Sequence, residues 1–146
     1  MRVLVDTNII VDVLQHREPW CKDGETIFIS AAKRQITACV TAKQIADIHY
    51  LTKKLLKGQE HVDEAARQVI GKLLQFIELI DARAADCKTA IAINNSDFED
   101  AMLIACASHE AMDYIVSRNP VHFDCSAVPV IAPADFVKLL PASMLK

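Results

Sequence analysis

The chain has 146 residues, 52% of them hydrophobic, and a formal net charge of −3 with a pI near 5.9. This composition excludes a disordered linker and argues against strong non-specific binding of nucleic acid through a broad basic surface. The length fits one domain, which we expect to cover residues 1–146. The apolar runs are too short for a membrane span, and five scattered cysteines without zinc-ligand spacing indicate reduced thiols in a cytoplasmic protein.

The apolar patterns predict strands and helices that alternate along the chain. The first strand ends at Asp6, and Thr7 and Asn8 are expected to form the turn and cap before the first helix. Ser96 is the predicted cap of a later helix, and the proline in the last strand predicts an edge position. Helices are expected at residues 9–15, from 20 or 23 to 34, 43–57, 62–76, 84–93, 97–110 and 134–140, and further strands at 35–41, 77–81, 113–117 and 128–131.

This alternation predicts an α/β fold, with a central parallel sheet of four to five strands and helices on both faces. Acidic or amide side chains stand near the ends of several strands or open the following helices: Asp6, Asp47, Asp97, Asp100 and Asn119. Because the carboxyl ends of parallel strands meet at one edge of a sheet, we expect these side chains to share one cleft.

Carboxylates that share a cleft repel one another and raise one another's pKa. A hard divalent cation removes that repulsion, and Mg²⁺ or Mn²⁺ prefers oxygen ligands of this kind. Such an ion can activate a water and stabilise the leaving oxygen of a phosphodiester. The set of acids therefore predicts a metal site with hydrolytic chemistry.

Each of these residues also has a plainer interpretation. Asp6 could cap the first helix, and Asp97 and Asp100 suit the positive end of a helix dipole. Asn119 could simply tolerate a left-handed turn before Pro120.

Three stretches of the chain stand in the order seen in a known family. They are Val3-Leu4-Val5-Asp6-Thr7-Asn8, then Thr41-Ala42-Lys43-Gln44-Ile45-Ala46-Asp47-Ile48, then Asp97-Phe98-Glu99-Asp100-Ala101 with the later Asp113-Tyr114-Ile115-Val116-Ser117-Arg118-Asn119-Pro120. This ordered set resembles the PIN-domain family, in the branch of bacterial ribonuclease toxins from type II toxin–antitoxin pairs. The resemblance implies a PIN-like three-layer α/β/α fold. It also implies an endoribonuclease that needs Mg²⁺ or Mn²⁺ to hydrolyse phosphodiester bonds of single-stranded RNA.

The resemblance further assigns roles to single residues. It implies that Asp6, Asp47 and Asp100 are catalytic, and that the metal ligands are Asp6, Asp100, Asp97, Asp47 and Asn119. Thr7 and Arg118 are the expected substrate-binding residues. The expected partners are the RNA substrate, a small antitoxin protein and a second copy of the chain, with part of the helices at residues 43–76 in the homodimer interface.

Two positions depart from the family's pattern. Asp47 is one methylene shorter than the usual Glu, so we expect it to reach the ion through water. His122 stands where the family often carries Asp. These departures keep a second hypothesis open, namely an inert PIN-fold module that acts through protein contacts. A phosphatase fits less well, because Asn8 stands where that chemistry needs a second Asp.

Overall fold

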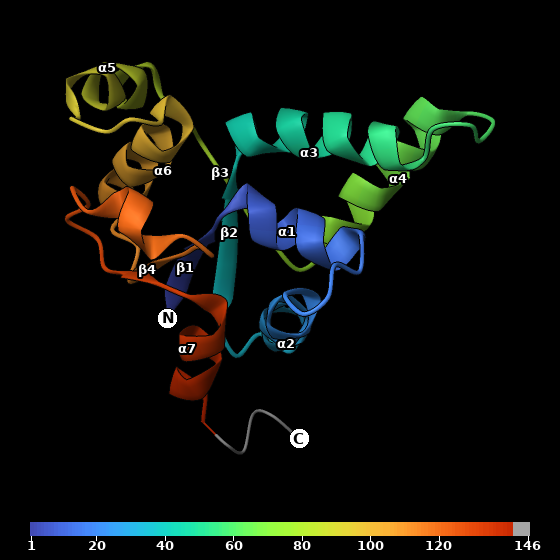
Figure 1. Cartoon of the computed structure of the whole chain (residues 1–146), viewed down its shortest axis with the longest axis horizontal. Coiled ribbons are helices and arrows are strands. Elements are labelled where there is room, and N and C mark those ends of the chain that lie inside the picture. The colour runs from blue at the N-terminus through green and yellow to red at the C-terminus, as the bar shows by residue number, and fades with distance from the viewer. Residues whose placement is uncertain (142–146) are drawn as a thin grey trace.

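The alternating elements form a five-stranded sheet with helices around it in the computed structural model, which describes residues 1–141 (Figure 1). The last five residues of the predicted domain, 142–146, therefore lie outside the described residues. No helix within residues 1–141 is both long enough and apolar enough to cross a membrane. The elements are β1 (Arg2–Val5), α1 (Thr7–Leu14), α2 (Cys21–Ala32), β2 (Thr37–Thr41), α3 (Ala42–Leu55), α4 (Val62–Leu73), β3 (Glu78–Ile80), α5 (Ala84–Ala92), α6 (Phe98–His109), β4 (Tyr114–Val116), the 3₁₀ turn η1 (Pro120–Phe123), β5 (Val130–Ile131) and α7 (Pro133–Leu139).

The strands lie in the order β3-β2-β1-β4-β5, and every neighbouring pair is parallel. β1 is the central strand, with Val3 opposite Ala38 of β2 and Tyr114 of β4. The predicted parallel sheet is confirmed, and β5 lies at an edge as its proline indicated. All the carboxyl ends consequently point to one side of the sheet.

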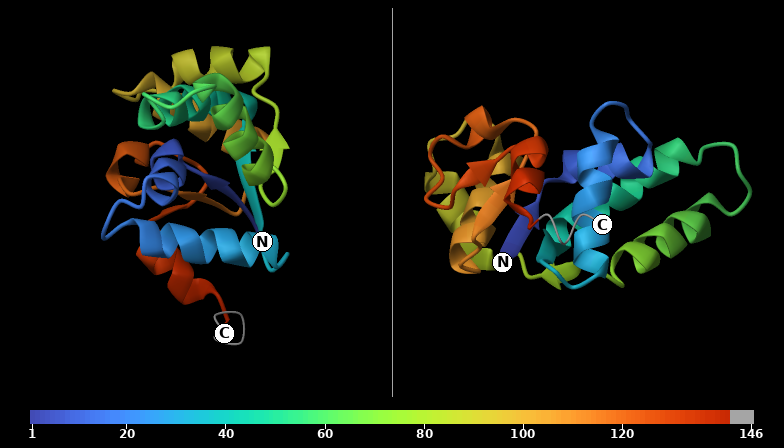
Figure 2. Two further views of the ribbon diagram at one scale, coloured as in Figure 1. Left: turned by 90° about the vertical axis from the view of Figure 1, so that its right-hand side faces the viewer. Right: turned by 90° about the horizontal axis from the view of Figure 1, so that it is seen from below.

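Successive residues of β1 face opposite layers, as the period of a strand requires. Val3 and Val5 are fully buried in a core with residues of α1, α2, α3, α4 and α7. Leu4 faces the other way, toward Leu103 and Ile104 of α6, and α5 packs on the outer side of α6. The sheet is thus covered on both faces, and the predicted three-layer α/β/α architecture is confirmed (Figure 2).

The ends of the elements differ from the predicted ones in a few informative places. α1 begins at Thr7, two residues earlier than expected, so that Asp6 rather than Thr7 or Asn8 is its N-cap residue. The prediction of Ser96 as the cap of α6 is wrong, because Asp97 holds the N-cap position and accepts the backbone hydrogen bonds. The short turn η1 after β4 was not predicted.

Candidate active site at the carboxyl edge of the sheet

Asp6 lies directly after the central strand β1, and its carboxylate is held by two side-chain donors. Ser117 Oγ donates to Asp6 Oδ2 at 2.7 Å, and Asn8 Nδ2 donates to the same oxygen at 2.9 Å. Ser117 follows β4, so the parallel pairing of β1 with β4 brings this donor to Asp6. Although Asp6 is the N-cap residue of α1, its side chain makes no capping hydrogen bond. Capping therefore does not explain this carboxylate.

Asp97 and Asp100 both come from the start of α6. Asp97 Oδ1 accepts hydrogen bonds from the backbone nitrogen of Glu99 at 2.8 Å and from that of Asp100 at 3.2 Å. The capping role that the sequence left open for Asp97 is therefore present in the structure. By fixing the first turn of α6, the cap also orients Asp100, whose side chain is 14% exposed.

A cleft of about 390 Å³ opens at this edge of the sheet. Its lining includes five of the predicted site residues, namely Asp6, Thr7, Asp97, Asp100 and Asn119. The left-handed turn considered for Asn119 is wrong, because its φ is −119°. Asn8, Arg17, Glu99, Ser117 and His122 also line the cleft. The expected convergence of strand ends thus occurs for most of the predicted residues.

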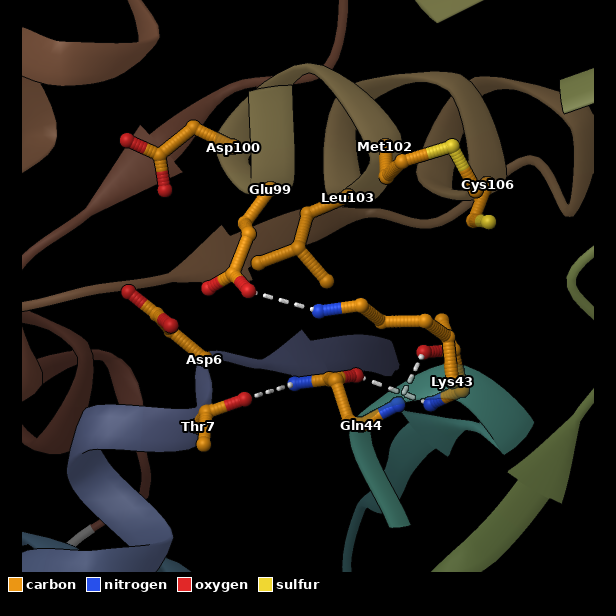
Figure 3. Close-up of a pocket in the computed structure, with 10 residues that line it drawn as sticks. Asp6, Thr7, Lys43, Gln44, Glu99, Asp100, Met102, Leu103 and Cys106 are labelled. Carbon is orange, nitrogen blue, oxygen red and sulfur yellow. Dashed lines mark hydrogen bonds and ion pairs between the residues drawn. The ribbon is translucent and has the colours of Figure 1, made fainter. Parts of the chain in front are cut away.

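A smaller cavity of about 40 Å³ shares part of this lining and extends toward α3. Figure 3 shows Asp6, Glu99 and Asp100 at one end of this cavity, with Met102 and Cys106 at the other. The acids are therefore gathered at the end that adjoins the larger cleft.

The two buried acids of the cleft bind their protons more tightly than a free aspartate does. Burial and, to a smaller extent, the negative charges of Asp97 and Asp6 together raise the pKa of Asp100 to about 6, while His122 opposes the rise. Nδ1 of His122 lies 3.7 Å from Asp100 Oδ2. Burial also raises the pKa of Asp6, against its donors Ser117 and Asn8, which favour the anion. Repulsion between acids at one place is the condition that a bound cation relieves.

Asp47 does not line the cleft. Its Oδ2 accepts a hydrogen bond from Lys43 Nζ at 2.5 Å, one turn earlier on α3, and the same ammonium donates to Glu99 Oε1 at 2.8 Å. Lys43 therefore connects α3 to α6 beside the acids and neutralises part of their charge (Figure 3).

Gln44 is a site residue that the sequence reasoning missed. It is almost fully buried, and its Nε2 donates to the carbonyl of Val5 at 2.8 Å and to Thr7 Oγ1 at 3.2 Å. Its Oε1 accepts from the backbone nitrogen of Thr41 at 2.8 Å, while Thr41 Oγ1 accepts from the backbone nitrogen of Gln44 at 3.2 Å. This is a capping box, and its Thr-x-x-Gln spacing could have revealed Gln44 in the sequence. Gln44 ties the start of α3 to the end of β1.

Arg118 also lies outside the lining of the cleft, although its neighbours Ser117 and Asn119 belong to it. The Arg118 guanidinium lies 3.2 Å from Asp12 Oδ2 and stacks over the Trp20 ring, 4.7 Å from its centroid. Its charge is thus directed toward α1 and the start of α2 rather than toward the acids.

The oxygen donors of the cleft fit a hard cation that keeps part of its water shell. Asp6 and Asp100 supply two carboxylates, and Mg²⁺ in proteins is often bound by one or two carboxylates with waters completing the octahedron. Asn8 Oδ1 is buried at the cleft without a hydrogen-bond partner in the described residues, which leaves one more oxygen to bind water or an ion. Within residues 1–141 no group of three or more acidic, histidine or cysteine side chains is arranged so that the group could hold a metal ion.

Comparisons with known proteins agree with this geometry. A family model for the PIN domain matches residues 2–120, while no curated protein matches the sequence. The solved structures that share the fold include the three that follow. VapBC2 from Rickettsia felis, bound to a DNA fragment from its promoter, is 17% identical with a TM-score of 0.63, over 90% of this chain and 98% of that one. FitAcB from Neisseria gonorrhoeae is 15% identical with a TM-score of 0.68, over 90% and 98%.

The third is VapC20 from Mycobacterium tuberculosis, a toxin that cleaves the sarcin-ricin loop, which is 12% identical with a TM-score of 0.57, over 77% of this chain and 86% of that one. At these identities the likeness shows a common fold. The family model, in contrast, matches most of the sequence, including Asp6, Asp47, Asp100 and Asn119. The chain therefore belongs to the PIN domain family.

Proposed function

We propose that this PIN domain is an endoribonuclease that uses Mg²⁺ or Mn²⁺ to hydrolyse phosphodiester bonds of single-stranded RNA. The observation that carries the proposal is the pair Asp6 and Asp100, two acids in one cleft whose pKa values are both raised by burial. A bound divalent ion supplies an activated water and stabilises charge on the phosphate oxygens.

The protein's own residues have distinct tasks in this proposal. Asp6, Asp100 and Asp97 would hold the ion directly or through water, with Asn119 beside them. Asp47 would reach the ion through water only after leaving its ion pair with Lys43. Ser117 and Asn8 favour the anion of Asp6 and fix the position of its carboxylate, since both donate to one of its oxygens. Thr7, which Gln44 positions, lines the cleft and could contact a substrate phosphate there.

A role as the toxin of a type II toxin–antitoxin pair is the biological part of the proposal. VapBC2 and FitAcB share the fold over 90% of this chain, and the protein from Klebsiella pneumoniae that also shares it was solved as a toxin–antitoxin complex. VapC20, a toxin that cleaves RNA in the sarcin-ricin loop, supports RNA as the substrate class. A small partner protein that blocks cleavage when the two are mixed is the expected antitoxin.

The proposal is tested by cleavage of a labelled single-stranded RNA with Mg²⁺, with Mn²⁺ and with chelator. Cleavage is expected only with metal and is expected to be lost in Asp6→Asn. Asp135→Asn is the matched control, because it removes an exposed acid of α7 that does not line the cleft. Wild-type protein that cleaves no RNA with either ion would contradict the proposal.

An inert binding module is the second candidate, and the position of Asp47 favours it. The ion pair with Lys43 leaves the cleft without a third carboxylate from α3. Calorimetry with Mn²⁺ separates the two functions. An enzyme binds the ion and loses that binding in Asp6→Asn, whereas an inert module shows no specific binding in either protein.

A further inference from the structure

A cluster of four side chains lies next to the cleft and has no part in the chemistry described above. It consists of Asp12 on α1, Arg17 and Trp20 in the connection to α2, and Arg118 after β4. Arg17 lines the cleft, and Arg118 stands between two residues that do so. The cluster is therefore continuous with the candidate active site.

Asp12 holds the two arginines of this cluster in place. Only 1% of its side chain is exposed, and its carboxylate oxygens have no hydrogen-bond partner in the described residues. Oδ2 of Asp12 lies 3.2 Å from Arg118 Nε, and Oδ1 lies 3.8 Å from an Arg17 guanidinium nitrogen. A single carboxylate faces two guanidiniums, so the cluster keeps a positive charge at the edge of an acidic cleft.

Trp20 is the only tryptophan of the chain, yet 49% of it is exposed. Arg118 lies over its ring at 4.7 Å from the centroid, and Arg118 is in turn paired with the buried carboxylate of Asp12. The indole is thus a rigid aromatic surface that is only partly covered. An exposed aromatic ring combined with arginines next to a cleft is informative, because binding sites for single-stranded nucleic acid combine cations with aromatic rings.

We propose that Trp20 stacks against a base of the RNA that enters the cleft, while Arg17 binds a backbone phosphate between that base and the acids. This inference rests on the proposed function and adds a substrate-binding residue to it. The charges support RNA over a protein partner, because Arg17 lines the cleft, Arg118 stands between two lining residues, and RNA is an anion. Stacking on aromatic rings tolerates any base, so Trp20 adds affinity with little sequence preference.

Trp20 is its own reporter, because no other tryptophan contributes to the fluorescence. The experiment titrates Asp6→Asn protein, which is expected to bind RNA without cutting it, with a single-stranded oligoribonucleotide. We expect a saturable change of the Trp20 emission, with the same midpoint as the anisotropy of labelled RNA. A duplex of the same sequence should give a weaker response, because its bases are already stacked.

In the same background, Trp20→Ala is expected to weaken RNA binding roughly 10-fold, the size of one lost base–aromatic contact, and Trp20→Phe should restore part of it. Tyr50→Ala is the matched control. Tyr50 is 60% exposed and also has a cation over its ring, Lys54, but its side chain does not line the cleft. Its loss should leave the RNA affinity unchanged.

Three outcomes would overturn the inference. RNA that binds Trp20→Ala as tightly as the parent protein, or that leaves the emission unchanged while anisotropy shows binding, would exclude stacking and leave the proposed function intact. If the Trp20 emission changes only when a partner protein is added, and not with RNA, the surface around Trp20 binds protein and not RNA. Absence of both RNA binding and RNA cleavage in the wild type would contradict the proposed function together with the inference.

Discussion

Asp6 and Asp100 face the same cleft but are held differently. Asp6 has two side-chain donors on one oxygen, which favours its anion, whereas Asp100 is surrounded mainly by other acids and by His122. Without a bound metal ion, the ionised carboxylate of Asp100 therefore destabilises the folded protein more than that of Asp6 does. This difference makes Asp100 the better position for a stability test.

Asp100→Asn is expected to stabilise the metal-free protein at neutral pH and to leave its stability unchanged near pH 4. The pKa of Asp100 rises from 3.8 to about 6 on folding, so the folded protein binds the proton more tightly than the unfolded chain. Below pH 3.8 Asp100 is protonated in both the folded and the unfolded protein and does not lower the free energy of unfolding. As the pH rises from 3.8 to 6, the unfolded chain loses this proton more easily than the folded protein does. Above pH 6 the ionised Asp100 therefore destabilises the fold of the wild type. With solvent screening allowed for, the gain at neutral pH is about 1 kcal/mol.

Urea unfolding of both proteins in chelator, at acidic and at neutral pH, measures this difference. An Asn variant that is no more stable than the wild type at neutral pH would show that Asp100 does not repel its neighbours. Addition of Mn²⁺ should reverse the order, because only the wild type keeps the carboxylate that binds the ion.

Asp47→Glu is expected to keep or increase RNA cleavage. The additional methylene restores the length that the side chain at this position usually has in the PIN family. A metal ion in the cleft can then compete with Lys43 for the carboxylate. Because 39% of the Asp47 side chain is exposed, the longer side chain can be accommodated without overpacking. The rate of cleavage at saturating metal is the measurement, and Asp47→Gln is the control of equal length without charge. Loss of activity in a folded Glu variant would show that Asp47 is not a shortened ligand.

At the scale of single residues, the acids after strands were predictable, and their partners were not. An acid that follows a buried strand must lie at the edge of the sheet, which is why Asp6 was identified from the first residues of the chain. The direction of Asp47 depends instead on Lys43 and on Glu99, which comes 56 residues after Lys43. No local pattern contains that contact.

At the scale of elements, the contact between α1 and α2 fixes the position of a helix that contributes to the cleft. Gly24 of α2 lies where a Cβ atom would come within 2.5 Å of Val13 Cγ2 and 3.2 Å of Ile9 Cγ2 on α1. The close approach of these helices sets the position of α1, whose first residue Thr7 lines the cleft. The absence of a side chain at Gly24 is thus a packing requirement.

Gly24→Ala is expected to destabilise the protein by about 1–2 kcal/mol, because the cost of overpacking exceeds the gain in helix propensity. Gly71→Ala is the matched control, since Gly71 lies inside α4 with nothing within 4 Å of the added Cβ. That change should stabilise the fold by about 0.5–1 kcal/mol through helix propensity alone. Thermal unfolding of the two variants checks both signs, and a neutral Gly24→Ala would mean that the helices can separate at no cost.

The helices and strands were predictable as elements, but their exact ends were less so. Apolar spacing identified every regular helix and strand, because each buries one face or lies inside the sheet. Ser96 and Asp97 are both good capping residues, so the sequence alone could not decide between them. The geometry decides for Asp97, because Asn95 Oδ1 accepts its backbone hydrogen bond at 2.8 Å.

At the scale of the whole molecule, the layers were predictable and the order of the strands was not. Alternating strands and helices imply a parallel sheet covered on both faces. The position of β1 between β2 and β4 depends on how the connections cross the sheet, and apolar patterns do not record that. This order is also what brings Ser117 to Asp6.

The last expectation at this scale is a homodimer that uses part of the α3–α4 pair. The two helices pack against each other and extend beyond the sheet (Figure 1). Leu55 of α3 is 47% exposed, which leaves apolar surface for a second copy to cover. Light scattering at micromolar concentration should give the mass of a dimer, and Leu55→Lys should shift it to the monomer because a lysine cannot be buried there without a partner.

Ile91→Lys is the control, since Ile91 is 75% exposed on α5, on the other face of the sheet. A wild type that is monomeric, or an Ile91→Lys variant that dissociates as readily as Leu55→Lys, would contradict this interface.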